Sequence, residues 1–313
     1  MGIYSLQTLR EIVDHKFQLV GLTTGGNSLE FKFDAAARAL KATQRNVLNR
    51  KTFQELCIEQ GWVRSTPLED RKNISIRSFT DGPTDYLDAL SENTLSLVEL
   101  FDVRHLRDGI DWNNDVRAAV EEFLTRVRQT AKNIRLFLDS HSSIAFLAGT
   151  MLGFKTGTHV EINQKGRGPT TVWRSDDGKV GTAAATEMIP VGMGEEIAVV
   201  ISLSRNALAD VEEYIRAHVQ TIGRILHVSA ANGPSPKALV GGEHAAEVAD
   251  QIADAVKALR LQKDARRHVF IAAPNAFTFF LGQHREALGP VTLYEFDFEG
   301  AVNGSYNPSL RIG

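Results

Sequence analysis

The sequence of 313 residues lacks several features that mark common classes of protein. Cys57 is the only cysteine, which excludes an internal disulfide and a cysteine-rich zinc site and is typical of a cytoplasmic protein. No apolar run approaches the roughly 20 residues that span a bilayer. The first residues do not show a basic segment followed by an apolar core, so we expect no secretory signal. We therefore expect a cytoplasmic protein with no membrane partner.

Several motifs of familiar enzymes are also missing. The nine histidines include no HExxH pair, which argues against a zinc hydrolase. No GxGxxG follows a predicted strand and no GxxxxGK[ST] is present, so dinucleotide and Walker-type phosphate sites have no support. The formal charge of −3 predicts no general affinity for nucleic acid, and any basic surface must therefore be local.

One strand–turn–helix unit occurs twice, and the rest of the chain is organised around it. The first copy runs from Arg135 to Gly149, and the second runs from His268 to Gly282. In each copy a short apolar run predicts a buried strand, and an apolar helix follows a polar turn. The same spacing relates Phe137 to Phe270, Phe146 to Phe279, Gly149 to Gly282 and Trp173 to Tyr306. Duplication explains this series of matches.

The order of elements predicts an α/β fold with two fused Rossmann-like halves. Strands alternate with helices from residue 134 onward, which favours mainly parallel sheets covered on both faces. We expect the duplicated domain over residues 98–313, with halves of about 98–205 and 206–313, after a small N-terminal α/β module over 1–95. Helices are expected at 86–101 and 112–128, and a loop at 178–194.

The N-terminal module permits three interpretations. Helices at 35–40 and 43–60, with basic residues concentrated between 32 and 51, would suit a helix-turn-helix that binds nucleic acid. Alternatively, Glu30 and Lys32 on a short strand, with Asp14 upstream, are the residue types of a nuclease site that holds Mg²⁺. The third interpretation is a small module whose basic face is solvated or contacts another subunit. The residues leave all three open.

Small polar residues and cations follow four of the predicted strands. Parallel sheets bind ligands at the carboxyl ends of their strands, where helix N-termini present free N–H groups. These residue types suit phosphates, ribose hydroxyls and base edges, although capping of the next helix is the alternative, and burial is the alternative for His141. They are Ser140, His141, Ser142 and Ser143; Ser204, Arg205 and Asn206; Ser229, Asn232, Gly233, Ser235 and Lys237; and Pro274 and Asn275.

Two further groups are candidate ligand contacts. Lys165 and Arg167 lie between two strands of the first copy, where they would form either a cationic flap over an anionic ligand or an exposed hairpin. Trp173 and Tyr306 occupy matched positions in the two copies. Each would either stack on a base or belong to the core.

The motifs of the duplicated region resemble the SAVED domain over about residues 98–313. The segment Ser-Ile-Ala-Phe-x-x-Gly at 143–149 carries the resemblance, together with the following motifs in the same order. They are Thr171–Val172–Trp173–Arg174, Ala273–Pro274, Leu281–Gly282 and Tyr306–Asn307–Pro308, and the lead-in Leu100–Phe101–x–x–Arg104 with Asp111–Trp112. SAVED domains are similar to two fused CARF-type Rossmann-like units, which agrees with the duplication.

The resemblance implies a sensor. SAVED domains bind cyclic oligonucleotide second messengers, often adenosine-rich cyclic tri- or tetranucleotides, in CBASS and type III CRISPR antiviral defence. Binding usually drives homo-oligomerisation, which activates an attached effector or a partner protein. The sensor part would need no cofactor, whereas Mg²⁺ would be needed if the N-terminal module were a nuclease. Residues 1–95 show no HNH, TIR-like or protease pattern, so the nature of the effector is left open.

Overall fold

The computed structural model describes residues 41, 71–79, 93–164, 171–298 and 305–313. The chain divides into two compact units, residues 1–70 with 154–157, and residues 71–153 with 158–313. The second unit contains both sheets and the helices between them. The predicted helix-turn-helix and the Glu30–Lys32 nuclease site lie outside the described residues.

The first sheet has five strands in the order β2-β1-β5-β6-β7. The pairs β1/β2, β1/β5 and β5/β6 are parallel, and β6/β7 is antiparallel. A two-stranded antiparallel ribbon, β3 with β4, lies between β2 and β5 in the chain and forms a separate small sheet. The strands are β1 (Lys72–Arg77), β2 (Asn93–Ser96), β3 (Phe101–Asp102), β4 (His105–Leu106), β5 (Asn133–Asp139), β6 (His159–Gln164) and β7 (Thr171–Trp173).

The second sheet has six strands in the order β13-β12-β11-β9-β10-β8. Its inner strands β12, β11, β9 and β10 are parallel, and both edge strands are antiparallel to their neighbours. The strands are β8 (Ala185–Pro190), β9 (Glu196–Ser202), β10 (Ile222–Ser229), β11 (Arg267–Ala272), β12 (Val291–Phe296) and β13 (Tyr306–Ile312).

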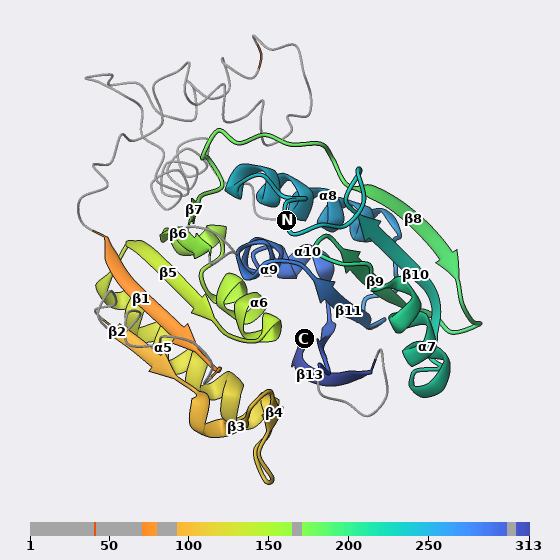
Figure 1. The fold of residues 1–313 in the computed structure, drawn as a ribbon, viewed down its shortest axis with the longest axis horizontal. Coiled ribbons are helices and arrows are strands. Elements are labelled where there is room, and N and C mark those ends of the chain that lie inside the picture. Colours follow the sequence, from red (N-terminus) through yellow and green to blue (C-terminus); the bar gives the residue numbers. More distant parts are fainter. Residues whose placement is uncertain (1–40, 42–70, 80–92, 165–170, 299–304) are drawn as a thin grey trace, which may run out of the picture. The chain divides into compact units, whose positions relative to one another are not determined.

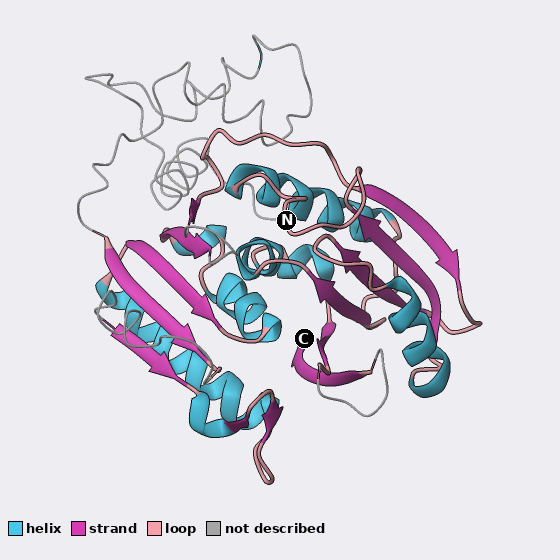
Figure 2. Cartoon of the chain, viewed as in Figure 1, coloured by secondary structure: helices cyan, strands magenta, loops and turns pink. Residues whose placement is uncertain are grey.

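Helices fill the space between the two sheets (Figures 1 and 2). One continuous core joins apolar side chains of both sheets to α5, α6, α8 and α9, whereas α7 covers the opposite face of the second sheet. The helices of this unit are η1 (Val98–Leu100), η2 (Trp112–Val116), α5 (Arg117–Thr130), α6 (Ser142–Met151), α7 (Leu208–His218), α8 (Gly242–Ala258), α9 (Asn275–Gly282) and α10 (Arg285–Leu288), and η3 (Phe154–Thr156) belongs to the first unit. No helix among the described residues is long and apolar enough to cross a bilayer.

The two copies seen in the sequence have the same topology. The order β5-α6-β6-β7 corresponds to β11-α9-β12-β13, with the last pair of strands antiparallel in both halves. The prediction of an α/β fold with two Rossmann-like halves and mainly parallel sheets is confirmed. The helices of the two copies, α6 and α9, pack directly against each other at the centre of the unit.

The boundaries differ from those expected. Strand β1 falls within the range expected for the N-terminal module, yet it pairs with β5 along its whole length, so the first half begins near residue 71. Strand β9 belongs to the second sheet because it lies between β10 and β11, so the halves separate between β7 and β8 rather than at 205/206. These pairings join strands far apart in sequence, which local pattern does not reveal.

Two local predictions are corrected. The helix expected over 86–101 is wrong from residue 93, because β2 forms there and pairs with β1, with Ser75 Oγ donating to Thr94 Oγ1 at 2.8 Å. The loop expected at 178–194 contains the strand β8, which pairs with β10 over six residues. Tertiary pairing overrides local preference at both places. The helix expected at 112–128 is present as η2 and α5.

Candidate functional site

His141 is buried in the first half. Its Nε2 lies 3.0 Å from the carbonyl oxygen of Arg104 and its Nδ1 lies 2.7 Å from the Ser78 hydroxyl. Nε2 therefore carries the hydrogen and Nδ1 accepts from Ser78, which defines the neutral tautomer. The ring stacks on Phe101 with centroids 4.4 Å apart and meets Trp112 edge-on. These contacts assign His141 a packing role, the alternative that the sequence left open.

The pKa of His141 predicts acid sensitivity of the fold. Burial lowers this pKa, and the Arg104 and His105 charges lower it further, against an opposing effect of Glu295. A folded pKa below the unfolded value of about 6.5 means that its contribution to stability is complete above about pH 6.5 and is lost as pH falls toward the folded pKa. His227 and His268 shift in the same direction, also through burial.

We therefore expect the melting temperature to decline as the pH falls from 6.5 to 5. Each histidine changes the free energy of unfolding by at most about 1.4 kcal/mol per pH unit. His141→Gln should make the melting temperature less dependent on pH, although it lowers the stability at neutral pH. Thermal melts of both proteins from pH 5 to 8 measure this. A melting temperature that rises below pH 6.5 would show that burial does not control these groups.

Each of the two central helices is capped by a side chain from the opposite half. Glu295 on β12 accepts from the backbone N–H of Ser143 at 2.6 Å and from the Ser142 hydroxyl at 3.0 Å, at the N-terminus of α6. Gln164 on β6 accepts from the N–H of Ala276 at 3.1 Å, at the N-terminus of α9. The sites where a ligand phosphate would meet these helix ends are thus filled by the protein's own oxygens.

Further bonds join the halves around these caps. The Ser143 and Ser309 hydroxyls form a hydrogen bond with each other. The Asn275 side-chain amide donates a hydrogen bond to the Ser140 carbonyl oxygen at 2.7 Å. Pro274 precedes α9, and its carbonyl accepts from Thr278 N. Ser140, Ser142, Ser143 and Asn275 therefore form contacts between the halves, whereas Pro274 bonds within its own half.

Removing the Glu295 carboxylate should destabilise the contact between the halves. Glu295→Ala leaves the Ser143 N–H without its charged acceptor, so we expect a loss of about 1.5–3 kcal/mol. Gln164→Ala removes a neutral acceptor at the matched position and should cost about 1 kcal/mol. Denaturant unfolding measures both, with the exposed Glu122→Ala as control. Equal losses for Glu295→Ala and Glu122→Ala would contradict the capping role.

Arg205, which follows β9, already has partners within the protein. Its guanidinium donates to Asp210 at 2.8 Å and to the Tyr306 hydroxyl at 3.3 Å, and lies 3.9 Å from the centre of the Phe296 ring. Asn206 caps α7 by accepting from Leu208 N, and Ser204 N donates to the Ala272 carbonyl. Contact of Arg205 with a ligand phosphate stays a prediction.

The two matched aromatic residues lie in the core. Trp173 is buried and its indole N–H donates to Thr171 Oγ1 at 3.0 Å. Tyr306 is buried against Phe270 and Phe296, and burial raises its pKa. Both therefore occupy the core position that the sequence allowed as the alternative to base stacking. Lys165 and Arg167 lie outside the described residues.

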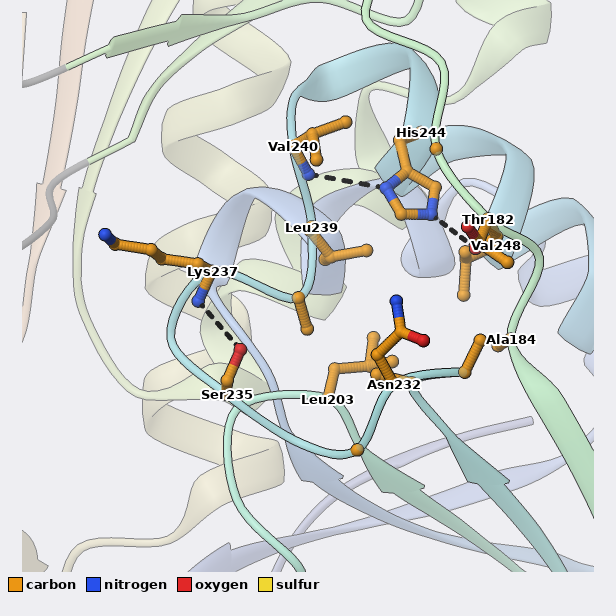
Figure 3. Close-up of a pocket in the computed structure, with 15 residues that line it drawn as sticks. Thr182, Ala184, Leu203, Asn232, Ser235, Lys237, Leu239, Val240, His244 and Val248 are labelled. Carbon is orange, nitrogen blue, oxygen red and sulfur yellow. Dashed lines mark hydrogen bonds between the residues drawn. The ribbon is translucent and has the colours of Figure 1, made fainter.

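A cavity of about 240 Å³ lies at the carboxyl ends of β9 and β10. Its walls come from the segment before β8, the segment after β10 and the first turns of α8 (Figure 3). Four of the predicted ligand residues line it, namely Asn232, Gly233, Ser235 and Lys237. The position agrees with the expectation for ligand sites on parallel sheets. The lining residues are Gly181, Thr182, Ala184, Leu203, Ala230, Ala231, Asn232, Gly233, Ser235, Lys237, Ala238, Leu239, Val240, His244 and Val248.

His244 at the start of α8 was missed by sequence reasoning. The buried imidazole accepts from Val240 N at Nδ1, at 3.3 Å, and faces the Thr182 carbonyl through Nε2, at 2.8 Å. Gly181 lies against this ring, where a Cβ would overlap it. No motif surrounds His244, and these contacts depend on the fold. Among the described residues no group of three His, Cys, Asp or Glu side chains could hold a metal ion.

A family model described as "SMODS-associated and fused to various effectors sensor domain", or SAVED, matches residues 116–312. The chain belongs to the SAVED family. The resemblance seen in the sequence is thereby confirmed, and the matched SAVED domain contains α5, α6 and the whole second half.

Named relatives agree with this assignment. CD-NTase-associated protein 4 of Enterobacter hormaechei subsp. hoffmannii (strain UCI 50) is 44% identical over 308 residues, which is 98% of this chain and 62% of that protein. The chain therefore spans about three fifths of the length of that relative.

Two solved structures share the fold. The Cap4 SAVED/CARF-domain containing receptor of Acinetobacter baumannii, with the cyclic trinucleotide 2'3'3'-cAAA, has a TM-score of 0.55 at 16% identity, over 83% of this chain and 54% of that one. The Cap4 SAVED/CARF-domain containing receptor of Moraxella osloensis has a TM-score of 0.53 at 14% identity, over 98% of this chain and 64% of that one. At this identity the likeness concerns the fold alone.

Proposed function

We propose that this protein is a receptor for a cyclic oligonucleotide second messenger in antiviral defence. The observation that carries the proposal is the SAVED match over 116–312. The A. baumannii receptor with the same fold is described with a cyclic trinucleotide, which supports an adenosine-rich ring of three or four nucleotides. The sensor part of the chain catalyses no step in this proposal.

The ligand would bind at the carboxyl ends of the strands in the second half. The cavity beside Ser235 and Lys237 supplies the concave surface that small ligands need. If Lys165 and Arg167 form the cationic flap that the sequence allows, they would add positive charge toward the ring phosphates. The caps of α6 and α9 tie the two halves together, so a ligand that moves one half would act on the other.

Ligand binding would then drive assembly of several copies and activate an effector. The effector would be either the N-terminal module or a partner protein. A nuclease in that module would need Mg²⁺, and a module that binds nucleic acid would use residues 32–51. The relatives are longer than this chain, so the output of the whole protein is part of the proposal.

A thermal-shift series with cyclic di-, tri- and tetranucleotides tests the proposal. A ring present at about 100 times its dissociation constant stabilises the folded state by about 2.7 kcal/mol, which raises the melting temperature by about 5–10 °C. Linear triadenylate is the control, because it carries the same bases and phosphates without the closed ring. Sedimentation velocity with and without the stabilising ring then measures assembly. If no ring raises the melting temperature, the proposed function is wrong.

A further inference from the structure

The cavity at the ends of β9 and β10 is lined by neutral groups. Lys237 is the one charged side chain among its 15 lining residues, and its ammonium extends away from the cavity (Figure 3). Both His244 ring nitrogens already have partners, because Nδ1 accepts from Val240 N and Nε2 faces the Thr182 carbonyl. A phosphate that entered would therefore find no buried cation to pair with, and a charged group is costly to bury without a partner.

The Asn232 side chain points into this cavity from the loop after β10 (Figure 3). Within the described part of the chain its amide has no hydrogen-bond partner, whereas Ser235 Oγ already accepts from Lys237 N at 3.3 Å. A carboxamide presents a donor and an acceptor side by side. That pair matches the edge of a nucleobase, and Asn pairs with adenine through its N6 and N7 atoms.

The size and walls of the cavity suit one flat ring system. Its volume of about 240 Å³ is below the range of about 300–1,000 Å³ that holds a whole drug-sized ligand. Leu203, Leu239 and Val248 provide apolar surface for the faces of a base. The described lining carries no carboxylate that would accept from the N–H groups of guanine.

We propose that this cavity holds one purine base of the ligand, adenine in preference to guanine, with its edge paired to the Asn232 amide. The phosphates and the rest of the ring stay outside, on the side where Lys237 lies. The identity of the ligand as a ring rests on the proposed function, whereas recognition of the base rests on the cavity alone. Two experiments separate these claims.

The first experiment uses adenosine, which carries the base without a phosphate. Adenosine at about millimolar concentration should shift the side-chain amide NMR signals of Asn232, which are assigned by their loss in Asn232→Ala. Ribose 5-phosphate should leave the Asn232 signals unchanged. The side-chain amide signals of exposed Asn114 should not shift with either compound. A site that responds to ribose 5-phosphate and not to adenosine would overturn the assignment, and so would no response to adenosine.

The second experiment uses 2'3'3'-linked cyclic triadenylate, whose unequal linkages make its three adenines distinct, and variants in which each adenine is replaced in turn by purine, which lacks the N6 amino group. Asn232→Ala should weaken binding of the ring by about tenfold to a hundredfold, with Asn114→Ala as the unaffected control. Replacement of one particular adenine by purine should weaken binding of the ring to the wild-type protein. The same replacement should not weaken binding to Asn232→Ala any further, because the contact is already lost. A ring that binds Asn232→Ala as tightly as the wild type would overturn the base site and leave the proposed function intact. A wild type that binds no ring would contradict the proposed function, and the adenosine measurement would then decide the base site.

Discussion

Gly149→Ala is expected to lower the melting temperature by about 5–10 °C, and Gly282→Ala should do the same. Alanine in an ordinary helix interior is more stable than glycine by about 1 kcal/mol, so the usual effect of this change has the opposite sign. The expected net loss is about 2–3 kcal/mol, because a direct overlap with helix backbone should cost about 3–4 kcal/mol, at or above the upper end of the usual overpacking range, less the gain of about 1 kcal/mol.

The physical reason is the crossing of α6 and α9. A Cβ at Gly149 would overlap with the carbonyl oxygen of Phe279, and a Cβ at Gly282 would overlap with the carbonyl oxygen of Phe146. Both obstacles are helix backbone, which cannot turn aside as a flexible side chain can. Gly149 and Gly282 occupy matched positions in the two copies. Each glycine therefore allows the helix of the opposite half to approach closely.

The double variant and a loop glycine distinguish this reason from general sensitivity. Once one alanine has separated the helices, the second should cost less, so Gly149→Ala with Gly282→Ala should lose less than the sum of the single losses. Gly109→Ala is the control, because no atom lies within 4 Å of its added Cβ and only its φ of +83° opposes the change, at about 1 kcal/mol. Melts of these four variants and of the wild type measure this. Single variants as stable as the wild type would refute the close crossing.

Glu161→Ala should cost about 3 kcal/mol. The Glu161 side chain on β6 is only 4% exposed and accepts from both Arg71 and Arg135, which come from the chain just before β1 and from β5. One carboxylate thus joins three neighbouring parts of the first sheet. Its removal leaves two partly buried guanidinium groups without their acceptor, and breaking a buried pair typically costs about 3–5 kcal/mol.

Glu121→Ala on α5 is the matched control. Glu121 pairs with Arg117 one helical turn away, and its side chain is 37% exposed, so solvent screens the pair. Its removal should cost about 0.3–0.5 kcal/mol. Denaturant unfolding of both variants gives the comparison, and a similar small loss for the two would mean that Glu161 does not hold the sheet together.

The duplicated fold was predictable because its signals are local. Each copy shows an apolar strand, a polar turn and an apolar helix within fifteen residues, and the matched Phe and Gly positions are visible by eye in the sequence. The parallel order of the sheets followed from the alternation of strands and helices. Strand β8 was missed because it is an exposed edge strand held only by pairing with β10.

The candidate site was predicted less well, because it depends on contacts between distant residues. Ser143 and Glu295 are 152 positions apart, and nothing near Ser143 indicates that its N–H is already taken by a carboxylate. The predicted residues that follow the strands have two different roles. Those after β5 and β11 join the two halves, whereas those after β10 line the cavity. His244 and Gly181 enter the cavity only because α8 packs beside the segment before β8.

Calorimetric titration of this chain with cyclic triadenylate is the most direct test of the account. The account predicts saturable binding with a dissociation constant in the micromolar range or tighter, and no comparable binding of linear triadenylate. A panel that extends to cyclic tetranucleotides and to rings of other bases covers the remaining ring sizes. If no ring in that panel produces heat or saturation, the chain is not a receptor for cyclic oligonucleotides.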